Sequence, residues 1–522
     1  MTTYPGGVLL PPHVPFSTAE RKLTLSDPRI TRARDMGVQV DGPEKIIEMR
    51  EDFDGVYVPR GAAELFGWVR HPGMPRVVDI APRDLFDDGI VRSIPRPTAD
   101  LRDYQTKAVD ALVTSAQGYV VAPPGSGKTW IGAAAAGAVG LRTLVLVPTI
   151  DILDQWVKAF LSVLDLHVAR RGGGRKEHGH VTVATIQGFL DFDDREVIQY
   201  GAKFDVVILD ECHSVGAETF RRLFWLLPCP VRWGLTATPY RDDGLTDLIG
   251  WTFGRELYEI DHESLISAGH LRRPRVERVN VDFAYPLSHV LYLSGRGYGP
   301  VKHLRPKPDV MTAVREALAY AYAYAGRPVK VWGIGDDERE AVATLCKEHG
   351  AQHKIQTDPK SWAACMKELT MDPQINDMIV DYALEAVEEG GTFLALCGRV
   401  EWCQRLAKRV QDKGVDADAL FSKVGAKKRR TTLERLRSGD LHVVFATTLA
   451  DVGLDVPTLD RAVIAFPGRA KGRATQRLGR LMRPDGALQP LIRDLVQVNV
   501  PPLLNQWWSR KRAYIEIGAE VI

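Results

Sequence analysis

A short segment beginning at residue 122 has the composition of a phosphate-binding loop. It reads Ala-Pro-Pro-Gly-Ser-Gly-Lys-Thr, follows an apolar run, and precedes a helical pattern. Glycines at 125 and 127 leave room for backbone N–H groups to surround an anion, and the following helix points its positive end at the same place. Lys128 would reach the terminal phosphates of a nucleoside triphosphate, and the Thr129 hydroxyl would ligate Mg²⁺. Ala122 stands where the general pattern has glycine, a position that need not touch phosphate.

A pair of carboxylates follows downstream at the end of a second apolar run. Asp210 and Glu211 come directly after the run from Phe204 to Leu209. Asp210 could hold the metal through a water, and Glu211, which the pleat would turn the opposite way, could polarise an attacking water. Alone, such a pair is usually a solvated turn. The phosphate loop upstream in the same domain favours the catalytic interpretation.

Short apolar runs alternating with helical patterns must position these groups. The expected strands are 119–121, 143–147, 181–184, 206–209 and 233–235, and the pattern returns at 393–396, 443–446 and 462–465. Such alternation predicts parallel sheets with helices on both faces. We therefore expect an α/β protein with two sheet domains in tandem.

The predicted domain boundaries follow changes in composition. Residues 1–95 are rich in proline and predict a small N-terminal accessory domain that could recognise a binding partner through its basic residues. The first sheet domain is expected at 96–260 and the second at 261–522. An insertion at about 285–370 lies within the second, and its role cannot be read from composition.

The motifs together resemble those of a known family. Asp210-Glu211-Cys212-His213 resembles the DExH box of superfamily 2 helicases. Further segments resemble the family's other motifs in order: Leu101–Gln105 (Gln motif), Pro148-Thr149 with Gln155-Trp156 (Ia), Val183–Gln187 (Ib), Thr236–Gly244 (III), Phe393–Leu396 (IV), Ala446–Pro457 (V) and Gln476–Pro484 (VI). The extension of motif III is similar to that of the branch typified by XPB and the UvsW-type phage helicases. The resemblance covers about residues 101–280 and 375–520.

This resemblance implies two RecA-like domains that use ATP and Mg²⁺ and act on DNA. The implied catalytic residues are Asp210, Glu211, Gln476, Arg480 and Arg483, with both arginines reaching ATP from the second domain. The implied ATP-binding residues are Gln105, Gly125, Ser126, Gly127, Lys128 and Thr129, with Thr129 and Asp210 toward Mg²⁺. Coupling falls to His213, Thr236, Thr238, Gly453 and Asp455, and nucleic-acid contacts to Pro148, Thr149, Thr185, Arg241 and Thr448.

Charge and cysteine usage limit the other possibilities. The 68 basic and 66 acidic residues nearly cancel, so nucleic acid must be met by local patches such as 170–180, 423–437 and 469–483. No run reaches the about 20 apolar residues of a membrane span. The six cysteines form no C-x-x-C pair, which predicts reduced thiols in a cytoplasmic protein, expected to be monomeric.

The expected function is an ATP-dependent DNA helicase or translocase. By resemblance it would move 3′ to 5′ and remodel duplex or branched DNA in recombination, repair or replication. Alternatives are an RNA helicase, a duplex translocase that does not unwind, and an ATP-switched clamp without turnover. Near the C-terminus, Trp507 and Trp508 could stack on bases or pack against the second domain, and the sequence leaves both open.

Overall fold

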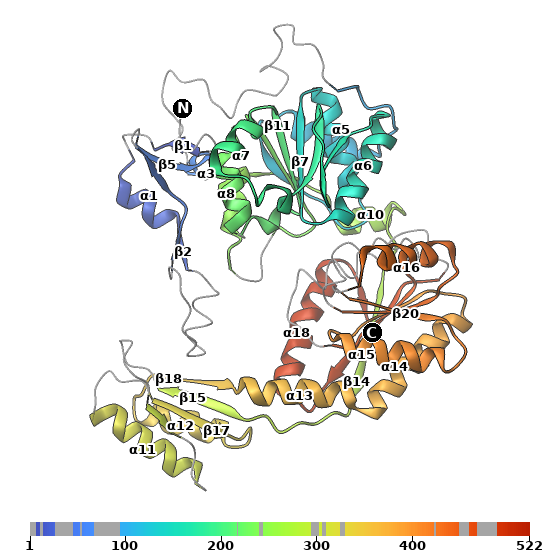
Figure 1. The fold of residues 1–522 in the computed structure, drawn as a ribbon. Coiled ribbons are helices and arrows are strands. Elements are labelled where there is room, and N and C mark those ends of the chain that lie inside the picture. The colour runs from blue at the N-terminus through green and yellow to red at the C-terminus, as the bar shows by residue number, and fades with distance from the viewer. Residues whose placement is uncertain are drawn as a thin grey trace.

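The computed structural model describes most of the chain, including both predicted sheets (Figure 1). The described residues are 7–10, 14–26, 45–52, 55–66, 94–216, 218–239, 244–293, 302–304, 309–323, 329–421, 424–447, 459–466 and 488–522. Statements about the structure concern these residues.

The first sheet has eight strands in the order β13-β6-β12-β11-β7-β10-β8-β9. Their bounds are β6 (Gln117–Val121), β7 (Thr143–Val147), β8 (Ala169–Gly172), β9 (Arg175–Lys176), β10 (Val181–Thr185), β11 (Val206–Asp210), β12 (Val231–Thr236) and β13 (Glu256–Glu259). All adjacent pairs are parallel except β8 with β9. The five strands predicted here are confirmed, because strands buried on both faces are continuous apolar runs.

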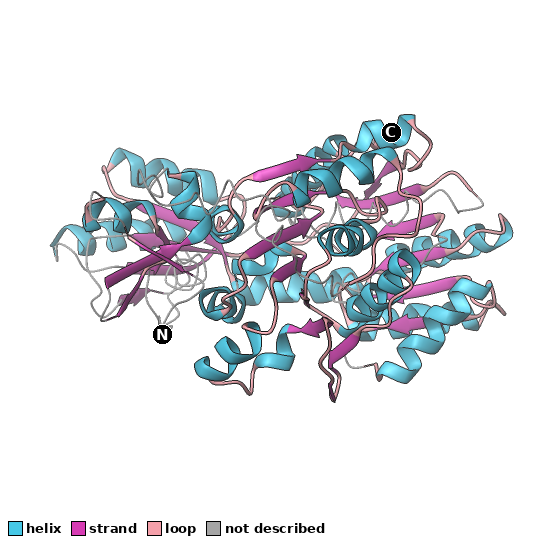
Figure 2. Ribbon diagram, turned by 90° about the horizontal axis from the view of Figure 1, so that it is seen from above, coloured by secondary structure: helices cyan, strands magenta, loops and turns pink. Residues whose placement is uncertain are grey.

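Helices cover both faces of this sheet (Figure 2). One core lies beneath α4 (Asp103–Val113), α5 (Lys128–Val139), α6 (Ile150–Leu164) and α10 (His262–Ser267). The other lies beneath α7 (Asp194–Gly201), α8 (Glu218–Leu226) and α9 (Asp247–Phe253).

The described N-terminal segments pack directly onto α8 and α9. Their elements are β1 (Gly7–Leu9), α1 (Phe16–Lys22), β2 (Thr24–Ser26), β3 (Lys45–Ile47), β4 (Arg50–Asp52), β5 (Gly55–Pro59) and α3 (Arg60–Leu65). Ala62 and Ala63 are fully buried in the same core as α9, and a Cβ at Gly61 would lie 2.2 Å from the carbonyl oxygen of Gly250. Glu48 accepts a hydrogen bond from Trp225 Nε1 at 3.0 Å. These segments therefore share a core with the first sheet domain.

The second sheet has seven strands in the order β20-β21-β19-β22-β23-β14-β24. Their bounds are β14 (Arg275–Val281), β19 (Phe393–Leu396), β20 (Ala417–Leu420), β21 (Val443–Ala446), β22 (Arg461–Ile464), β23 (Leu491–Gln497) and β24 (Glu520–Val521). One face is covered by α14 (Pro373–Glu388) and α15 (Val400–Gln411), the other by α16 (Ala426–Ser438) and α18 (Pro501–Glu516). The three strands predicted here are confirmed.

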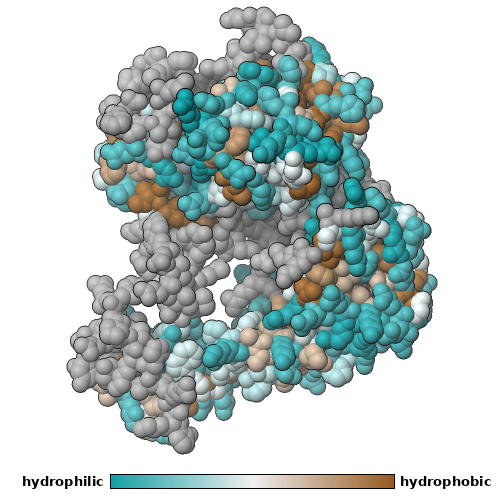
Figure 3. Space-filling model, in the orientation of Figure 1, coloured by the Kyte–Doolittle hydropathy of each residue, from teal (hydrophilic) through white to brown (hydrophobic). Residues whose placement is uncertain are grey.

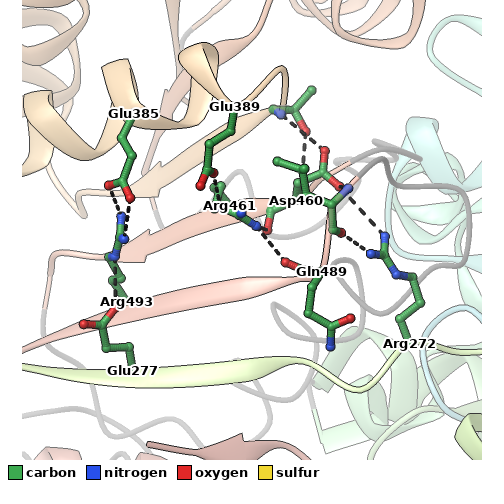
Figure 4. A network of polar contacts seen from close by, with 10 residues as sticks. Arg272, Glu277, Glu385, Glu389, Asp460, Arg461, Gln489 and Arg493 are labelled. Carbon is green, nitrogen blue, oxygen red and sulfur yellow. Dashed lines mark hydrogen bonds and ion pairs between the residues drawn. The ribbon is translucent and has the colours of Figure 1, made fainter.

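Strand β14 joins this sheet although it precedes the insertion in the chain. Arg493 on β23 contacts Glu277 on β14 at 3.0 Å and Glu385 on α14 at 2.6 Å (Figure 4). Upstream, Leu265 and Leu271 are buried in the first core. The second domain therefore starts structurally at β14, and α10, which the sequence boundary at 260 assigned to the second domain, packs with the first.

The segment between β14 and α14 contains a small α/β unit with its own core. Its elements are β15 (His289–Leu293), β16 (Lys302–Leu304), α11 (Val310–Ala323), β17 (Val329–Ile334), α12 (Arg339–Glu348) and β18 (His353–Thr357), and α13 (Pro359–Met371) leads back to the second domain. The sheet order is β16-β17-β15-β18. Figure 1 shows this unit at the far end of α13 from the second sheet.

The visible surface of the two sheet domains is largely hydrophilic with scattered apolar residues (Figure 3). Among the described helices, none combines the length and apolar character needed to cross a bilayer.

Candidate nucleotide-binding and catalytic site

The phosphate-binding loop connects β6 to α5 and has the predicted backbone geometry. Gly125 and Gly127 have φ angles of 86° and 82°, values that strain residues with side chains. A Cβ at Gly127 would lie 2.5 Å from Nε2 of Gln105. The loop therefore depends on glycine both for its path and for the room to pack against α4.

Gln105 is held against this loop by both ends of its amide. Its Nε2 donates to the carbonyl oxygen of Ser126 at 3.0 Å, and its Oε1 accepts from the backbone N–H of Arg102 at 3.0 Å. The Tyr104 hydroxyl donates to the same Ser126 oxygen at 3.1 Å, and its ring lies 5.5 Å from that of His270. The structure thus places the predicted Gln105 beside the loop and adds Tyr104 and His270, whose proximity no sequence pattern indicates.

The two carboxylates lie at the end of β11, next to the loop. Glu211 Oε1 is 4.0 Å from Nζ of Lys128, which also contacts the carbonyl oxygen of Ala122 at 3.4 Å. Asp210 is 4% exposed and accepts hydrogen bonds from Trp156 Nε1 at 2.7 Å and the Glu211 N–H at 2.9 Å. Burial, and secondly the charge of Glu211, raise the pKa of Asp210, while Lys128 opposes them. A cation bound nearby would therefore favour the charged form of Asp210, an arrangement found most often at binding and catalytic sites.

The prediction that the strand's pleat sets the direction of the Glu211 side chain is wrong. Strand β11 ends at Asp210, and Glu211 has a φ of 54°, in the left-handed region. A turn rather than the alternation of the pleat therefore sets its direction. A residue other than glycine held there stores roughly 1–3 kcal/mol of strain, a cost found most often at functional sites.

His213 connects the acidic box to the end of β12. Its Nδ1 lies 3.3 Å from Glu211 Oε2 and 3.0 Å from Oγ1 of Thr236. The Thr236 hydroxyl in turn donates to the carbonyl oxygen of Thr238 at 2.9 Å and accepts from its N–H at 3.1 Å. The three predicted coupling residues of the first domain are therefore joined by hydrogen bonds, and His213 at one end of this chain lies within ion-pair distance of Glu211.

The donor groups fit a hydrated Mg²⁺. Thr129 lies in the first turn of α5 and Asp210 offers a carboxylate, and hard oxygen donors of this kind suit Mg²⁺. Both Asp210 oxygens already accept hydrogen bonds. That arrangement fits the predicted contact through a water better than direct ligation.

His262 is a residue near the site that the sequence did not single out. Burial foremost, and the charge of Lys128 as well, lower its pKa to about 4, and its Nε2 is buried. The imidazole is therefore neutral at pH 7. It begins α10, directly before the passage into the second domain, and no motif could have revealed this.

Two of the predicted nucleic-acid contacts occupy neighbouring strand ends. Thr149 follows β7 and caps α6, with Oγ1 accepting from the N–H of Ile152 at 3.4 Å, and Pro148 beside it is half-buried. Thr185 ends β10 but is only 2% exposed, and a Cβ at Gly172 would lie 2.6 Å from its Oγ1. In this structure the β8–β9 hairpin covers the Thr185 hydroxyl, while Thr149 lies nearer the surface.

Two arginines of the basic patch at 170–180 are engaged within the protein, whereas Arg175 and Lys176 are exposed. Arg171 is 6% exposed and lies over the rings of Phe189, Phe192 and Tyr200. Arg170 pairs with Asp154 at 2.8 Å. Neither is displayed for phosphate.

Helix α16 carries the second basic patch and touches the first domain. Lys428 pairs with Asp418 at 3.4 Å, and Arg429 reaches Asp151 on α6 at 3.5 Å. This ion pair joins the two sheet domains within two residues of Thr149. The remaining predicted site residues lie outside the described residues: Arg241, Thr448, Gly453, Asp455, Gln476, Arg480 and Arg483.

Comparison with known proteins agrees with this arrangement. The family model "type III restriction enzyme, res subunit" matches residues 98–241, and "helicase conserved C-terminal domain" matches residues 375–485. The fold resembles the structure of an ATP-dependent type ISP restriction-modification enzyme, LlaBIII, bound to DNA, with a TM-score of 0.50, 12% identity, and coverage of 83% of this chain and 30% of that one.

Two relatives indicate which type of helicase the chain resembles. The chain is 25% identical over 76% of its length to the DNA 3′-5′ translocase XPB2 of Sulfurisphaera tokodaii, spanning 82% of that protein. It is 31% identical over 63% of its length to the DNA 3′-5′ helicase XPB of Mycobacterium tuberculosis, spanning 61% of it. The chain has two RecA-like sheet domains, matches both helicase models and is similar to XPB helicases and translocases, which is consistent with a superfamily 2 helicase of the XPB-like type.

Proposed function

We propose that this protein is an ATP-driven motor that translocates 3′ to 5′ on DNA and remodels duplex or branched substrates. One observation carries the proposal: Lys128 and Glu211 face each other at 4.0 Å. Glu211 also lies 3.3 Å from His213, which is hydrogen-bonded to Thr236, and Thr236 in turn to Thr238. Through these contacts, a nucleotide bound at Lys128 would be connected to the end of β12, outside the nucleotide pocket. The names of the XPB relatives support DNA as the track and 3′ to 5′ as the direction.

The residues of the first domain have distinct tasks in hydrolysis. The loop N–H groups and Lys128 would bind the phosphates, and Thr129 and Asp210 would hold a hydrated Mg²⁺, whose contribution when bound would be to neutralise phosphate charge. Glu211 orients the attacking water and accepts its proton, while the γ-phosphate leaves ADP. His213 lies beside the second oxygen of Glu211, so a change in the charge of that carboxylate changes the electrostatic interaction between the two side chains.

The second domain would complete the site. We assign Arg480 and Arg483 to the γ-phosphate, with Gln476 beside them and Gly453 and Asp455 in coupling, by family resemblance. Charge supplied at the transition state is typically worth about 10³–10⁵ in rate. ATP would then draw the two domains together and hydrolysis would release them, which moves one domain along the strand in each cycle.

DNA would lie across both domains and contact mainly its backbone. Pro148, Thr149, Thr185, Arg241 and Thr448 are the proposed contacts, and such contacts give little sequence preference. Because the β8–β9 hairpin covers Thr185 here, that contact requires the hairpin to shift. The N-terminal segments are a proposed surface for DNA recognition. Since they share a core with α9, this role should be tested by substitutions on their surface, because deleting residues 1–95 would also disturb the first domain.

The decisive experiment compares ATP hydrolysis in the presence of single-stranded DNA, duplex, a four-way junction and RNA. A DNA motor is stimulated by DNA, most by its preferred structure, whereas preferential stimulation by RNA would overturn the assignment. A strand-displacement assay separates a helicase from a duplex translocase that does not unwind. Lys128→Ala is the matched control, because losing the phosphate contact should abolish both readouts in a folded protein.

A further inference from the structure

Two adjacent tryptophans on α18 occupy opposite environments. Trp507 is 1% exposed and packs in the second core, with its ring 6.0 Å from that of Tyr514. Trp508 is 48% exposed. One residue along a helix turns the side chain by about 100°, so packing explains the first tryptophan and leaves the second unexplained.

The helix that displays Trp508 is fixed from its buried side. Arg510, 2% exposed, donates two hydrogen bonds of 2.7 Å to Asp494 on β23, and the Tyr514 hydroxyl donates to the same carboxylate at 2.6 Å. The entropic cost of ordering α18 when a ligand binds Trp508 is therefore small, which favours affinity.

Cationic side chains surround the exposed ring. The guanidinium carbon of Arg278, on β14, lies 5.9 Å from its centroid, and Nζ of Lys511 lies 5.5 Å from it. Arg512, one turn beyond Trp508, is exposed. Within the described part of the chain, Nε of Arg278 is buried and has no hydrogen-bond partner.

We propose that Trp508, Arg278, Lys511 and Arg512 form a platform for single-stranded DNA. An unpaired base would stack on the indole while the cations neutralise the adjoining phosphates, the combination by which single strands are bound without sequence preference. The charge argues for nucleic acid over a protein partner, because an apolar docking face would not ring its aromatic centre with three cations. This platform rests on the proposed DNA motor function and adds a second place where that motor holds an unpaired strand.

The test is equilibrium binding of a fluorescent oligo-dT to the full-length, nucleotide-free protein, followed by anisotropy. Trp508→Ala should weaken binding about 5- to 100-fold, as expected for one stacked base, and Trp508→Phe should retain most of the affinity. Ile515→Ala is the matched control, since Ile515 is 58% exposed on the same helix but offers no aromatic ring. Lys511→Ala should lower the slope of log affinity against log salt by about 0.7.

Abasic oligonucleotides distinguish stacking from other losses. They remove the base and keep the phosphates, so Trp508→Ala should cost much less on the abasic strand than on oligo-dT. An equal cost on both strands, or equal losses from Trp508→Ala and Ile515→Ala, would overturn stacking in favour of an apolar contact surface. The proposed function fails separately, by absence of DNA-stimulated hydrolysis in the unaltered protein.

Discussion

Each of the two RecA-like sheets buries a carboxylate, but the two are satisfied differently. Asp494 in the second sheet is fully buried and receives Arg510 and Tyr514. Asp210 in the first is 4% exposed and receives only neutral N–H groups, and burial raises its pKa. The guanidinium of Arg510 is the counterion of Asp494, whereas the hydrogen-bond donors to Asp210 are neutral and the charge of Lys128 offsets only part of the rise in its pKa.

This difference separates chemistry from architecture. A buried charge with its own counterion fixes an element, here α18 on β23. A buried charge without one shifts its pKa and marks a binding or catalytic site. Substitutions in the first sheet should therefore reduce turnover in a folded protein, and substitutions in the second should reduce stability.

The largest expected effect is on turnover. Glu211→Gln keeps the shape of the side chain but cannot accept the proton of water, so kcat for ATP should fall about 10²- to 10⁴-fold. Nucleotide binding should persist, because Lys128 and the loop remain. Measuring hydrolysis beside equilibrium binding of a fluorescent ATP analogue checks this. Undiminished hydrolysis would show that Glu211 is not the base, and undiminished DNA remodelling without hydrolysis would favour the ATP-switched clamp.

The next effect should appear as unfolding. Asp494→Ala removes the carboxylate that accepts two hydrogen bonds from the buried guanidinium of Arg510, which should cost about 3–5 kcal/mol of unfolding free energy. Tyr514→Phe removes one hydrogen bond to a charged group and should cost less, about 1.5–3 kcal/mol. Denaturant titration measures both. Equal stability of Asp494→Ala and the unaltered protein would remove the distinction drawn between the two sheets.

The contrast also shows what the sequence could predict. Both sheets could be predicted because buried parallel strands are uninterrupted apolar runs. Lys128 and Glu211 could be predicted because the motifs place one at the start of the helix after β6 and the other directly after β11. The contact of Asp210 with Trp156 could not be predicted, since Trp156 lies on α6 and only the packed fold brings its Nε1 to 2.7 Å.

Pairings across the fold account for the other differences. Composition favoured a separate N-terminal domain, but the close approach of Gly61 to Gly250 depends on tertiary contacts that proline content does not report. Likewise, the sequence left Trp507 and Trp508 undecided. Only the anchoring of Arg510 by Asp494 fixes which of the two faces solvent.

A third prediction concerns the chain leading from Glu211. His213→Ala removes the side chain that contacts both Glu211 and Thr236, so DNA stimulation of hydrolysis should fall more than hydrolysis without DNA. Coupling free energies of this kind correspond to about 5- to 150-fold. Steady-state ATP hydrolysis with and without DNA measures the ratio. Parallel losses in both rates would place His213 in the chemical step rather than in coupling.

The smallest expected effect tests the contact between the sheets. Asp151 and Arg429 lie 3.5 Å apart with side chains 34% and 24% exposed. Burial raises the pKa of Asp151, and Arg429 offsets this only in part. A double-mutant cycle with Asp151→Asn and Arg429→Gln should give a coupling of about 0.2–1 kcal/mol in denaturant unfolding, shrinking as salt rises. In the proposed cycle the two domains separate after hydrolysis, and a weak, salt-sensitive contact between them would permit that separation. A coupling well above that range would mean that the two domains form a stable interface. The first sheet domain could then not be treated as reactive and the second as structural independently of each other.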